Sequence, residues 1–325
     1  MDPKKVRNPM LGILVAHHCN LSCKGCSNLS SRLKKFFVAP YAVARDLSML
    51  ARVYDPECIV LIGGEPLLHP DLIEVIDAVR GSGISQYVKV VTNGILLSRM
   101  PREFWQRVDE VVISLYPTTM VDHEKIKTCH RKAKEHGVRI VLRYSDIFRE
   151  KFAELGTSDH QLVQRIYRTC QTTHFWRCHI LCDGHFFRCP QGALIPKVIE
   201  SVDAPDTFKD GVRISGDNNL LGTIKRYLSS KRPLNSCYRC LGTSGKEFLH
   251  VQEPSSAAQL PRTTEESISW QNLSKSEAVL SNPASWQRKR KVGQLASAAI
   301  GSLPLPFRMS KSTRRMIFWA RKLFE

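Results

Sequence analysis

The sequence has no run of apolar residues long enough to cross a membrane. The apolar stretch "MLGILVA" at residues 10–16 is far shorter than the roughly 18 residues that a membrane-spanning helix needs. No small-residue cleavage pattern follows it, so it does not have the form of a secretory signal peptide. These absences predict a cytoplasmic protein.

Acidic residues are scarce relative to basic ones. The chain carries 48 Lys and Arg against 30 Asp and Glu, a formal charge of +18 at pH 7. Residues 286–325 hold ten basic residues and one acid, so half of the excess lies in this tail. Its end, "KSTRRMIFWARKLFE", can form a basic amphipathic helix, which either stays solvated or contacts a membrane peripherally. Nucleic-acid binding is not expected, because no recognised module accompanies the charge.

Cysteine is the residue type of which the chain has many. In the reducing cytosol, eleven cysteines indicate metal binding or catalysis rather than disulfides. Cys58 and Cys129 stand alone in the sequence. Cys58 is expected to pack as a small apolar side chain in a buried strand. The other nine form three groups, as metal ligation requires: 19/23/26, 170/178/182/189 and 237/240.

The first half of the chain has the pattern of an α/β fold. Apolar segments separated by helices indicate a parallel sheet, and their spacing suits βα repeats in an open sheet or a full or partial barrel. The expected helices include residues 41–53 and 70–83. The expected strands are 10–16, 58–64, 87–93, 110–116 and 138–144.

The pattern changes after about residue 150. Residues 178–190 contain a hairpin signal with Asp183-Gly184 as its turn, and 191–236 read as irregular. Residues 160–245 hold little apolar sequence, so they are expected to depend on a metal centre. The expected domains are 1–158 as a partial barrel, 159–250 as a small metal domain, 251–285 as a linker and 286–325 as the basic tail.

Two motifs at strand ends carry the chemistry. Cys19-x3-Cys23-x2-Cys26 follows the first strand, and Gly63-Gly64-Glu65-Pro66 ends the second. A cubane of four irons needs four ligands, so three thiolates leave one iron open for another molecule. Ligands of parallel α/β sheets gather at the carboxyl ends of the strands, where both motifs fall. Zinc binding or inert thiols are the alternatives for the cysteines alone.

This combination resembles the radical S-adenosylmethionine (SAM) superfamily. The resemblance implies that Cys19, Cys23 and Cys26 hold a 4Fe–4S cluster whose open iron is chelated by SAM. It further implies SAM contacts from the GGEP residues and from polar strand ends. Many members carry an aromatic residue before the third cysteine, where this chain has Gly25, so another side chain must cover the adenine. The implied SAM contacts are Gly63, Gly64, Glu65, Pro66, Asn93, Ser114 and Arg143.

The later cysteines extend the resemblance. Cys170-x13-Gly184-x4-Cys189 followed by Cys237-x2-Cys240 is similar to the first part of the SPASM motif. The later cysteines of a full SPASM domain are absent, so the shortened "twitch" version is implied, with one auxiliary 4Fe–4S cluster. Its implied ligands are Cys170, Cys189, Cys237 and Cys240, with Cys178 as an alternative to Cys170. A zinc ribbon is the alternative site.

The implied function is that of a radical SAM oxidoreductase. A flavodoxin or ferredoxin would reduce the first cluster, SAM would be cleaved to a 5′-deoxyadenosyl radical, and the radical would take a hydrogen atom from the substrate. Dehydrogenation of a carbohydrate-like substrate is the first expectation. Epimerisation stays open, because Cys58, Cys129, Cys182 and either Cys170 or Cys178 are spare thiols.

Other hypotheses about the substrate and the function remain open from the sequence. A peptide substrate is less expected, because no leader-binding domain fits before the first strand. A metal-binding adaptor without turnover is the alternative of a different class, and an activase lacks its expected four-cysteine runs. His17, His18 and His69 are expected to be structural, while Tyr116-Pro117 either shapes the substrate pocket or forms a plain turn.

Overall fold

The computed structural model describes residues 5–119, 121–199, 209–253 and 262–281. The chain divides into a compact unit, Met1–Leu280, and a second unit, Ser281–Glu325. Only Ser281 of the second unit is described, so the expected basic tail at 286–325 lies outside the described residues. Among the described residues, no helix is long and apolar enough to cross a membrane.

Six parallel strands form the centre of the sheet, and the five expected strands are all present. The strand order is β5-β4-β3-β2-β1-β7-β8-β9, and every pair from β5 to β7 is parallel. The order is linear and ends at β5 and β9, so the sheet is a partial barrel rather than a closed one. The expected strands are β1 (Val6–Ala16), β2 (Tyr54–Gly63), β3 (Val88–Thr92), β4 (Glu110–Leu115) and β5 (Arg139–Tyr144).

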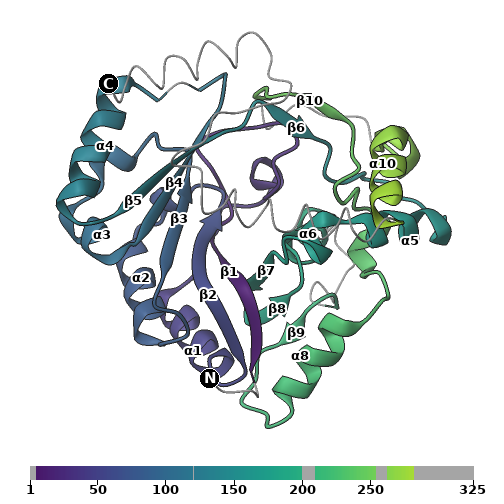
Figure 1. Cartoon of the computed structure of the whole chain (residues 1–325), viewed down its shortest axis with the longest axis horizontal. Helices are drawn as coiled ribbons and strands as arrows, with labels where there is room; N and C mark the ends of the chain where they lie inside the picture. Colours follow the sequence, from purple (N-terminus) through teal and green to yellow (C-terminus); the bar gives the residue numbers. More distant parts are fainter. Residues whose placement is uncertain (1–4, 120, 200–208, 254–261, 282–325) are drawn as a thin grey trace. The chain divides into compact units, whose positions relative to one another are not determined.

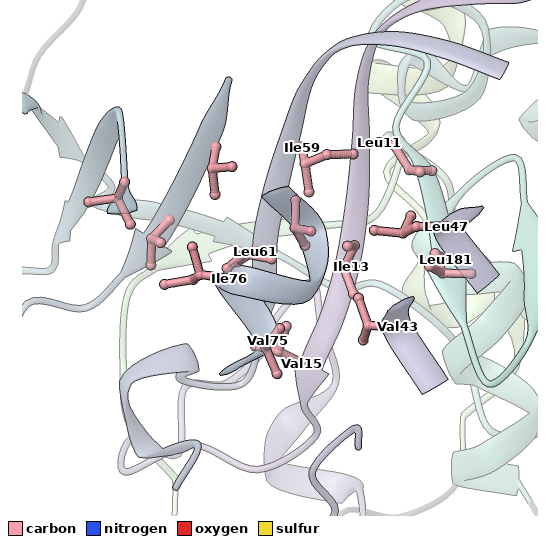
Figure 2. Packing of buried hydrophobic residues seen from close by; sticks show 14 of the residues in the cluster. Leu11, Ile13, Val15, Val43, Leu47, Ile59, Leu61, Val75, Ile76 and Leu181 are labelled. Atoms are coloured by element: carbon pink, nitrogen blue, oxygen red, sulfur yellow. The ribbon is translucent and has the colours of Figure 1, made fainter. Parts of the chain in front are cut away.

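The main hydrophobic core lies between this sheet and the helices that connect its strands (Figure 1). Leu11 and Ile13 on β1 pack against Val43 and Leu47, because alternate residues of a strand point to the same face (Figure 2). The other face is thereby left for the site. The helices on the core side are α1 (Pro40–Leu50), α2 (Leu72–Gly81), α3 (Arg102–Arg107) and α4 (His123–Glu135).

The expected hairpin is present and extends the main sheet. β7 (His179–Cys182) and β8 (His185–Phe187) are antiparallel, and β7 also pairs in parallel with β1. Asp183 and Gly184 have φ of 45° and 71°, the left-handed turn that Asp-Gly favours between twisted strands. A short strand, β9 (Val212–Arg213), follows β8. The later cysteines are therefore attached to the barrel sheet itself.

Several segments that read as irregular or as a linker are helical. Residues 191–236 contain most of α7 and all of α8. The first half of α7 is buried as a continuous run, while α8 buries Leu220 and Ile224. In the expected linker, Ile268 and Leu273 are fully buried, since they pack with Leu162, Ile166 and Leu241. The helices here are α5 (His160–Thr169), α6 (Gln171–His174), α7 (Pro190–Ile199), α8 (Leu220–Ser229), α9 (Thr264–Ser267) and α10 (Trp270–Leu280).

A two-stranded ribbon completes the described fold. β6 (Ile147–Arg149) pairs antiparallel with β10 (Glu247–Leu249), which brings the segment after the last cysteines beside the end of the barrel strands (Figure 1). Four short 3-10 helices lie in the connections: η1 (Ser30–Arg32), η2 (Pro66–Leu68), η3 (Leu97–Arg99) and η4 (Asn235–Tyr238).

Candidate radical SAM site

The first three cysteines lie in one compact loop, residues 17–29, directly after β1. Backbone bonds tighten this cysteine loop, with Cys26 N donating to Cys23 O at 3.3 Å and Leu29 N donating to Cys26 O at 3.0 Å. The segment after β10 closes over it, because Lys24 N donates to Val251 O at 3.0 Å. The loop is therefore held from both sides before any ligand binds.

Each sulfur of the cysteine loop has a polar neighbour. Asn93 Nδ2 lies 3.7 Å from Cys19 Sγ, and Ser30 Oγ lies 3.3 Å from Cys26 Sγ. His250 Nε2 lies 3.1 Å from Cys23 Sγ, while its Nδ1 lies 2.8 Å from Thr118 Oγ1. With the Thr118 hydroxyl donating to Nδ1, Nε2 carries the proton and donates to the sulfur. Such bonds to sulfur tune the potential of an iron–sulfur cluster.

The thiols suit a metal centre larger than one ion. Burial raises the pKa of Cys19 to about 11 and that of Cys23 to about 12, so both stay protonated until a cation binds them as thiolates. A single tetrahedral zinc, with Zn–S near 2.3 Å, would bring its sulfurs to about 3.8 Å from one another. Within the described residues, the three sulfurs do not all lie within 4.8 Å of one another. The three thiols are therefore not arranged around a single tetrahedral zinc.

The two glycines of GGEP allow the ends of β1 and β2 to touch. A Cβ on Gly63 would meet Ala16 O at 2.1 Å, and one on Gly64 would meet His18 O at 1.9 Å. In this close approach Gly64 N donates to Ala16 O at 2.7 Å, and the Asn28 side-chain amide donates to Gly63 O. Any other residue would push the cysteine loop away from β2.

The Glu65 carboxylate is occupied by the protein itself. It is buried, with Oε1 accepting from Leu67 N at 3.0 Å and from Thr92 Oγ1 at 2.7 Å. Oε2 accepts from Asn93 N at 2.8 Å. Burial raises the pKa of Glu65 despite these three bonds. The side chain therefore joins the ends of β2 and β3, and contact with SAM through the Glu65 backbone stays a prediction.

A cavity at the carboxyl edge of the sheet brings together most of the expected residues. Its lining contains the three cysteines of the loop with Gly63, Gly64, Asn93 and Ser114. Glu65, Pro66 and Arg143 do not line it, and Arg143 is exposed on β5 beside Ser114. Tyr116 and Phe148 also line this cavity. The SAM contacts expected from the resemblance all remain predictions.

The structure explains Gly25. Its φ of 60° is left-handed, and a Cβ there would meet Arg149 O at 2.5 Å and the Phe248 ring at 2.7 Å. The ribbon of β6 and β10 therefore lies where a side chain before the third cysteine would project. Phe148, from the same ribbon, packs with Tyr116 at 5.7 Å between ring centroids and brings an aromatic ring to the cavity.

Two residues of the site, His250 and Phe148, were not predicted from the sequence. The two rings pack with their centroids 4.7 Å apart, and His250 stacks on Tyr116 at 4.8 Å. Neither residue belongs to a cysteine or glycine motif, and β10 is only three residues long. No local sequence pattern pointed to either residue, because the ribbon that positions them forms by pairing between distant segments of the chain.

The auxiliary set, defined as Cys170, Cys189, Cys237 and Cys240, is brought together by α5, α7 and η4. Burial raises the pKa of Cys189, to about 12, and the pKa of Cys240. The charge of Cys170 is the second cause of both shifts. Burial and then the charges of Cys240, Cys189 and Cys170 raise the pKa of Cys237. Within the described residues, no three of these sulfurs all lie within 4.8 Å of one another. Their residue types and spacing fit a second cluster, which stays a prediction.

Cys178 lies beside this set without joining it. Burial raises its pKa to about 12, followed by the charge of Cys170, while Arg143 lowers it. Cys189, Cys237 and Cys240 do not contribute to its shift. Which of Cys170 and Cys178 is the fourth ligand stays a prediction.

The histidines after β1 and β2 have structural surroundings. His69 Nε2 lies 2.8 Å from Val38 O, and its Nδ1 accepts from Asp71 N at 3.0 Å. His17 is buried and forms, with Cys182 and Asp183, the one group of three possible metal ligands within 4.8 Å among the described residues. Lys197 Nζ lies 2.6 Å from Asp183 Oδ2, so an ammonium already neutralises this carboxylate.

Comparison with known proteins agrees with this geometry. Residues 13–156, from β1 to just beyond β6, match the family model of the Radical SAM superfamily. This part of the chain belongs to that superfamily. The matched residues include the cysteine loop, the GGEP residues and the strand ends that line the cavity.

Individual relatives are distant and partly covered. A "Probable GTP 3′,8-cyclase" of Sulfurisphaera tokodaii is 31% identical over 33% of this chain and 34% of the relative. The PqqA peptide cyclase of Gluconobacter oxydans is 27% identical over 37% of this chain and 34% of the relative. The solved structure of BtrN in complex with AdoMet and 2-DOIA is 14% identical with a TM-score of 0.43, covering 74% of this chain and 95% of that one. The chain spans about a third to a half of the length of the first curated relatives.

Proposed function

We propose that the protein is a radical SAM enzyme that dehydrogenates a carbohydrate-like small molecule. The observation that carries the radical chemistry is the cavity in which three thiols meet the Gly63-Gly64 backbone at the carboxyl edge of a parallel sheet. A 4Fe–4S cluster held by Cys19, Cys23 and Cys26 supplies, with SAM bound, the one-electron cleavage of SAM to methionine and a 5′-deoxyadenosyl radical.

The residues around the cavity have distinct tasks in this proposal. Gly63 and Gly64 offer backbone groups to SAM at a place where no side chain intervenes, and Asn93 and Ser114 offer polar groups to its ribose and carboxylate. Tyr116 and Phe148 contribute apolar surface that covers the adenine and excludes water. Exclusion of water and close positioning limit the damage that a misplaced radical would do.

The thiol positions favour dehydrogenation over epimerisation. Epimerisation needs a thiol that returns a hydrogen atom to the substrate. The spare thiols line neither the cavity of the cysteine loop nor a larger cavity that shares Cys23 and Cys26 with it; they are Cys58, Cys129, Cys178 and Cys182. Dehydrogenation instead removes a hydrogen atom from an alcohol carbon, a proton from its hydroxyl group and one further electron. A second 4Fe–4S cluster on the auxiliary set supplies an acceptor for that electron.

The partners follow from the same chemistry. A flavodoxin or ferredoxin is proposed as the donor of the electron that starts each SAM cleavage, as the cofactor requires. Peripheral membrane contact through residues 286–325 remains a proposal about a segment outside the described residues.

A deuterium-transfer experiment tests the reaction. The anaerobically reconstituted enzyme is reduced with dithionite and incubated with SAM and a panel of sugars and aminocyclitols deuterated at their alcohol carbons. Deuterium in 5′-deoxyadenosine together with a product three mass units lighter than the deuterated substrate, from loss of one deuterium and one hydroxyl proton, supports dehydrogenation. Formation of 5′-deoxyadenosine only in the presence of a peptide would overturn the carbohydrate proposal. A product one mass unit lighter than the deuterated substrate, with inverted configuration, would establish epimerisation instead, because a thiol returns hydrogen in place of the abstracted deuterium.

A further inference from the structure

A second and larger cavity adjoins the cysteine loop. Its volume is about 490 Å³, and Cys23 and Cys26 form part of one wall. Lys151 and Phe152 form part of another, and Phe152 pairs with Cys240 of the auxiliary set in an isolated antiparallel bridge. This charged cavity therefore lies between the residues of the first cysteine loop and the chain segment that reaches the auxiliary set.

Charged side chains line this cavity in a specific pairing pattern. Four are basic and three are acidic, and each acid is bound to one base. Lys24 Nζ lies 3.1 Å from Glu253, Arg32 Nη1 lies 2.6 Å from Glu154, and Arg262 Nη2 lies 3.0 Å from Glu150. The pairing uses every acid of the lining and leaves one basic residue, Lys151.

Lys151 has no ion-pair or hydrogen-bond partner for its ammonium among the described residues. Its backbone is fixed, because its carbonyl accepts from Leu241 N at 3.0 Å. Burial and then the charge of Arg149 lower its pKa, while Cys240, Cys26 and Cys170 raise it. The same side chain thus feels a thiol of the first loop and two of the auxiliary set. Lys151 is half-buried, and an unpaired cation that is partly withdrawn from water is stabilised when an anion meets it.

We propose that Lys151 binds an anionic group of the substrate, a phosphate or a carboxylate, inside the charged cavity. This inference rests on the proposed function and narrows the substrate to an acidic carbohydrate-like molecule. One charge-assisted hydrogen bond from the ammonium holds the anion, while the three neutralised pairs leave no acid in the lining free to repel it. The anchor places the substrate beside Cys23 and Cys26, on the loop where the radical would be formed.

Inorganic phosphate serves as the probe, because the substrate is unidentified. The holoenzyme is reduced with dithionite while S-adenosylhomocysteine takes the place of SAM, so that phosphate does not reach the open iron. The reduced clusters are paramagnetic, and phosphate bound between them relaxes faster in ³¹P NMR. The dependence of this relaxation on phosphate concentration gives the dissociation constant, and malonate is added as a dicarboxylate competitor.

Three variants separate direct binding from general charge. Lys151→Met should weaken phosphate binding about tenfold, because a charge-assisted hydrogen bond is lost, and Lys151→Arg should restore most of it. The double variant Arg32→Met with Glu154→Met removes a charge-neutral pair from the same cavity, so it should weaken binding less. Displacement by malonate would indicate a carboxylate-bearing substrate, and failure to displace would indicate a phosphate-bearing one.

Two results would overturn the inference. Equal weakening by Lys151→Met and by the double variant Arg32→Met with Glu154→Met would mean that Lys151 makes no contact of its own with the anion. Absence of any phosphate relaxation in the wild-type enzyme would mean that the cavity holds no anion site. Wild-type SAM cleavage under dithionite is measured in parallel, so that loss of the anion site alone is distinguished from failure of the radical SAM function.

Discussion

At the residue scale, Gly25 shows how a local backbone constraint protects the cysteine loop. The residue has a left-handed φ and lies against Arg149 O and the Phe248 ring, so a side chain there meets two obstacles at once. The left-handed conformation alone costs a non-glycine residue about 1–2 kcal/mol. The contact with backbone adds a displacement of β6 or of the loop itself.

A Gly25→Ala variant should therefore lose cluster as well as stability. Gly137→Ala is the matched control, because Gly137 has φ of 69° and an added methyl group there would meet nothing within 4 Å. The control should cost only about 1 kcal/mol. Iron content after anaerobic reconstitution and urea unfolding are the measurements. Equal stability loss and full iron content in both variants would show that the ribbon does not restrain the loop.

His250 is the second residue whose role is specific. Its Nε2–H points at Cys23 Sγ at 3.1 Å, and its ring stacks on Tyr116. A hydrogen bond to a ligand sulfur stabilises the more negative, reduced cluster and so raises its reduction potential.

His250→Phe keeps an aromatic ring and removes the hydrogen bond. The midpoint potential of the first cluster should fall, as measured by redox titration followed by EPR. The proposed auxiliary cluster would serve as an internal control, since the polar contacts of the His250 ring are with Cys23 and Thr118. An unchanged or higher potential of the first cluster would contradict the assigned bond.

At the scale of the elements, the sequence predicted the parallel strands because each is a buried apolar run between helices. All five expected strands exist, with ends within a few residues of their predicted positions. The hairpin at Asp183-Gly184 was equally readable from its turn residues. Its pairing with β1 was not, because the partner of an edge strand is chosen by tertiary packing rather than by local pattern.

The segments after residue 190 show the limit of local patterns. Helix α7 contains Pro196 and Gly192, which read as breakers, yet five of its residues are buried against the sheet. Helix α10 lies in a segment of polar composition, yet Leu273 is fully buried. In both cases burial of a few side chains outweighs weak helix propensity. The cysteine and glycine motifs were readable because their spacing is short, whereas His250 and Phe148 come from long-range pairing.

His69 joins the segment before α1 to the start of α2 and makes the fold sensitive to acid. Burial lowers its pKa below the ordinary value of 6.5, while Val38 O and Asp71 raise it less. The unfolded chain therefore binds a proton at a higher pH than the folded one. The free energy of unfolding is fully retained above about pH 6.5 and falls as the pH is lowered below it, by at most about 1.4 kcal/mol per pH unit from this group.

His69→Gln should flatten this dependence. Glutamine offers an oxygen to Asp71 N and an amide to Val38 O without gaining a proton. Urea unfolding of both proteins between pH 7.5 and 5.5 measures the difference in slope. Parallel slopes would show that His69 does not titrate on unfolding.

At the scale of the whole molecule, the two cysteine sets are parts of one compact unit. The main sheet runs from β5 through β1 to β9. The strand that carries Cys182 is hydrogen-bonded to the strand that precedes Cys19, and the strand that precedes Cys189 is its next neighbour in the sheet. The ribbon of β6 and β10 joins the same parts from the other side. The cysteine loop and the auxiliary set are therefore held in one compact unit by a continuous sheet.

Cleavage of SAM by the reconstituted protein is the most direct test of the site. The wild-type protein, reconstituted anaerobically with iron and sulfide and reduced with dithionite, should bind close to eight irons, two clusters of four, and convert SAM to 5′-deoxyadenosine. Cys26→Ala should abolish this conversion, while Cys58→Ala, whose sulfur lies near Pro9 O at the opposite end of the strands, should retain it. Colourless protein that retains zinc, or equal SAM cleavage by Cys26→Ala and the wild type, would contradict the assignment of the cysteine loop.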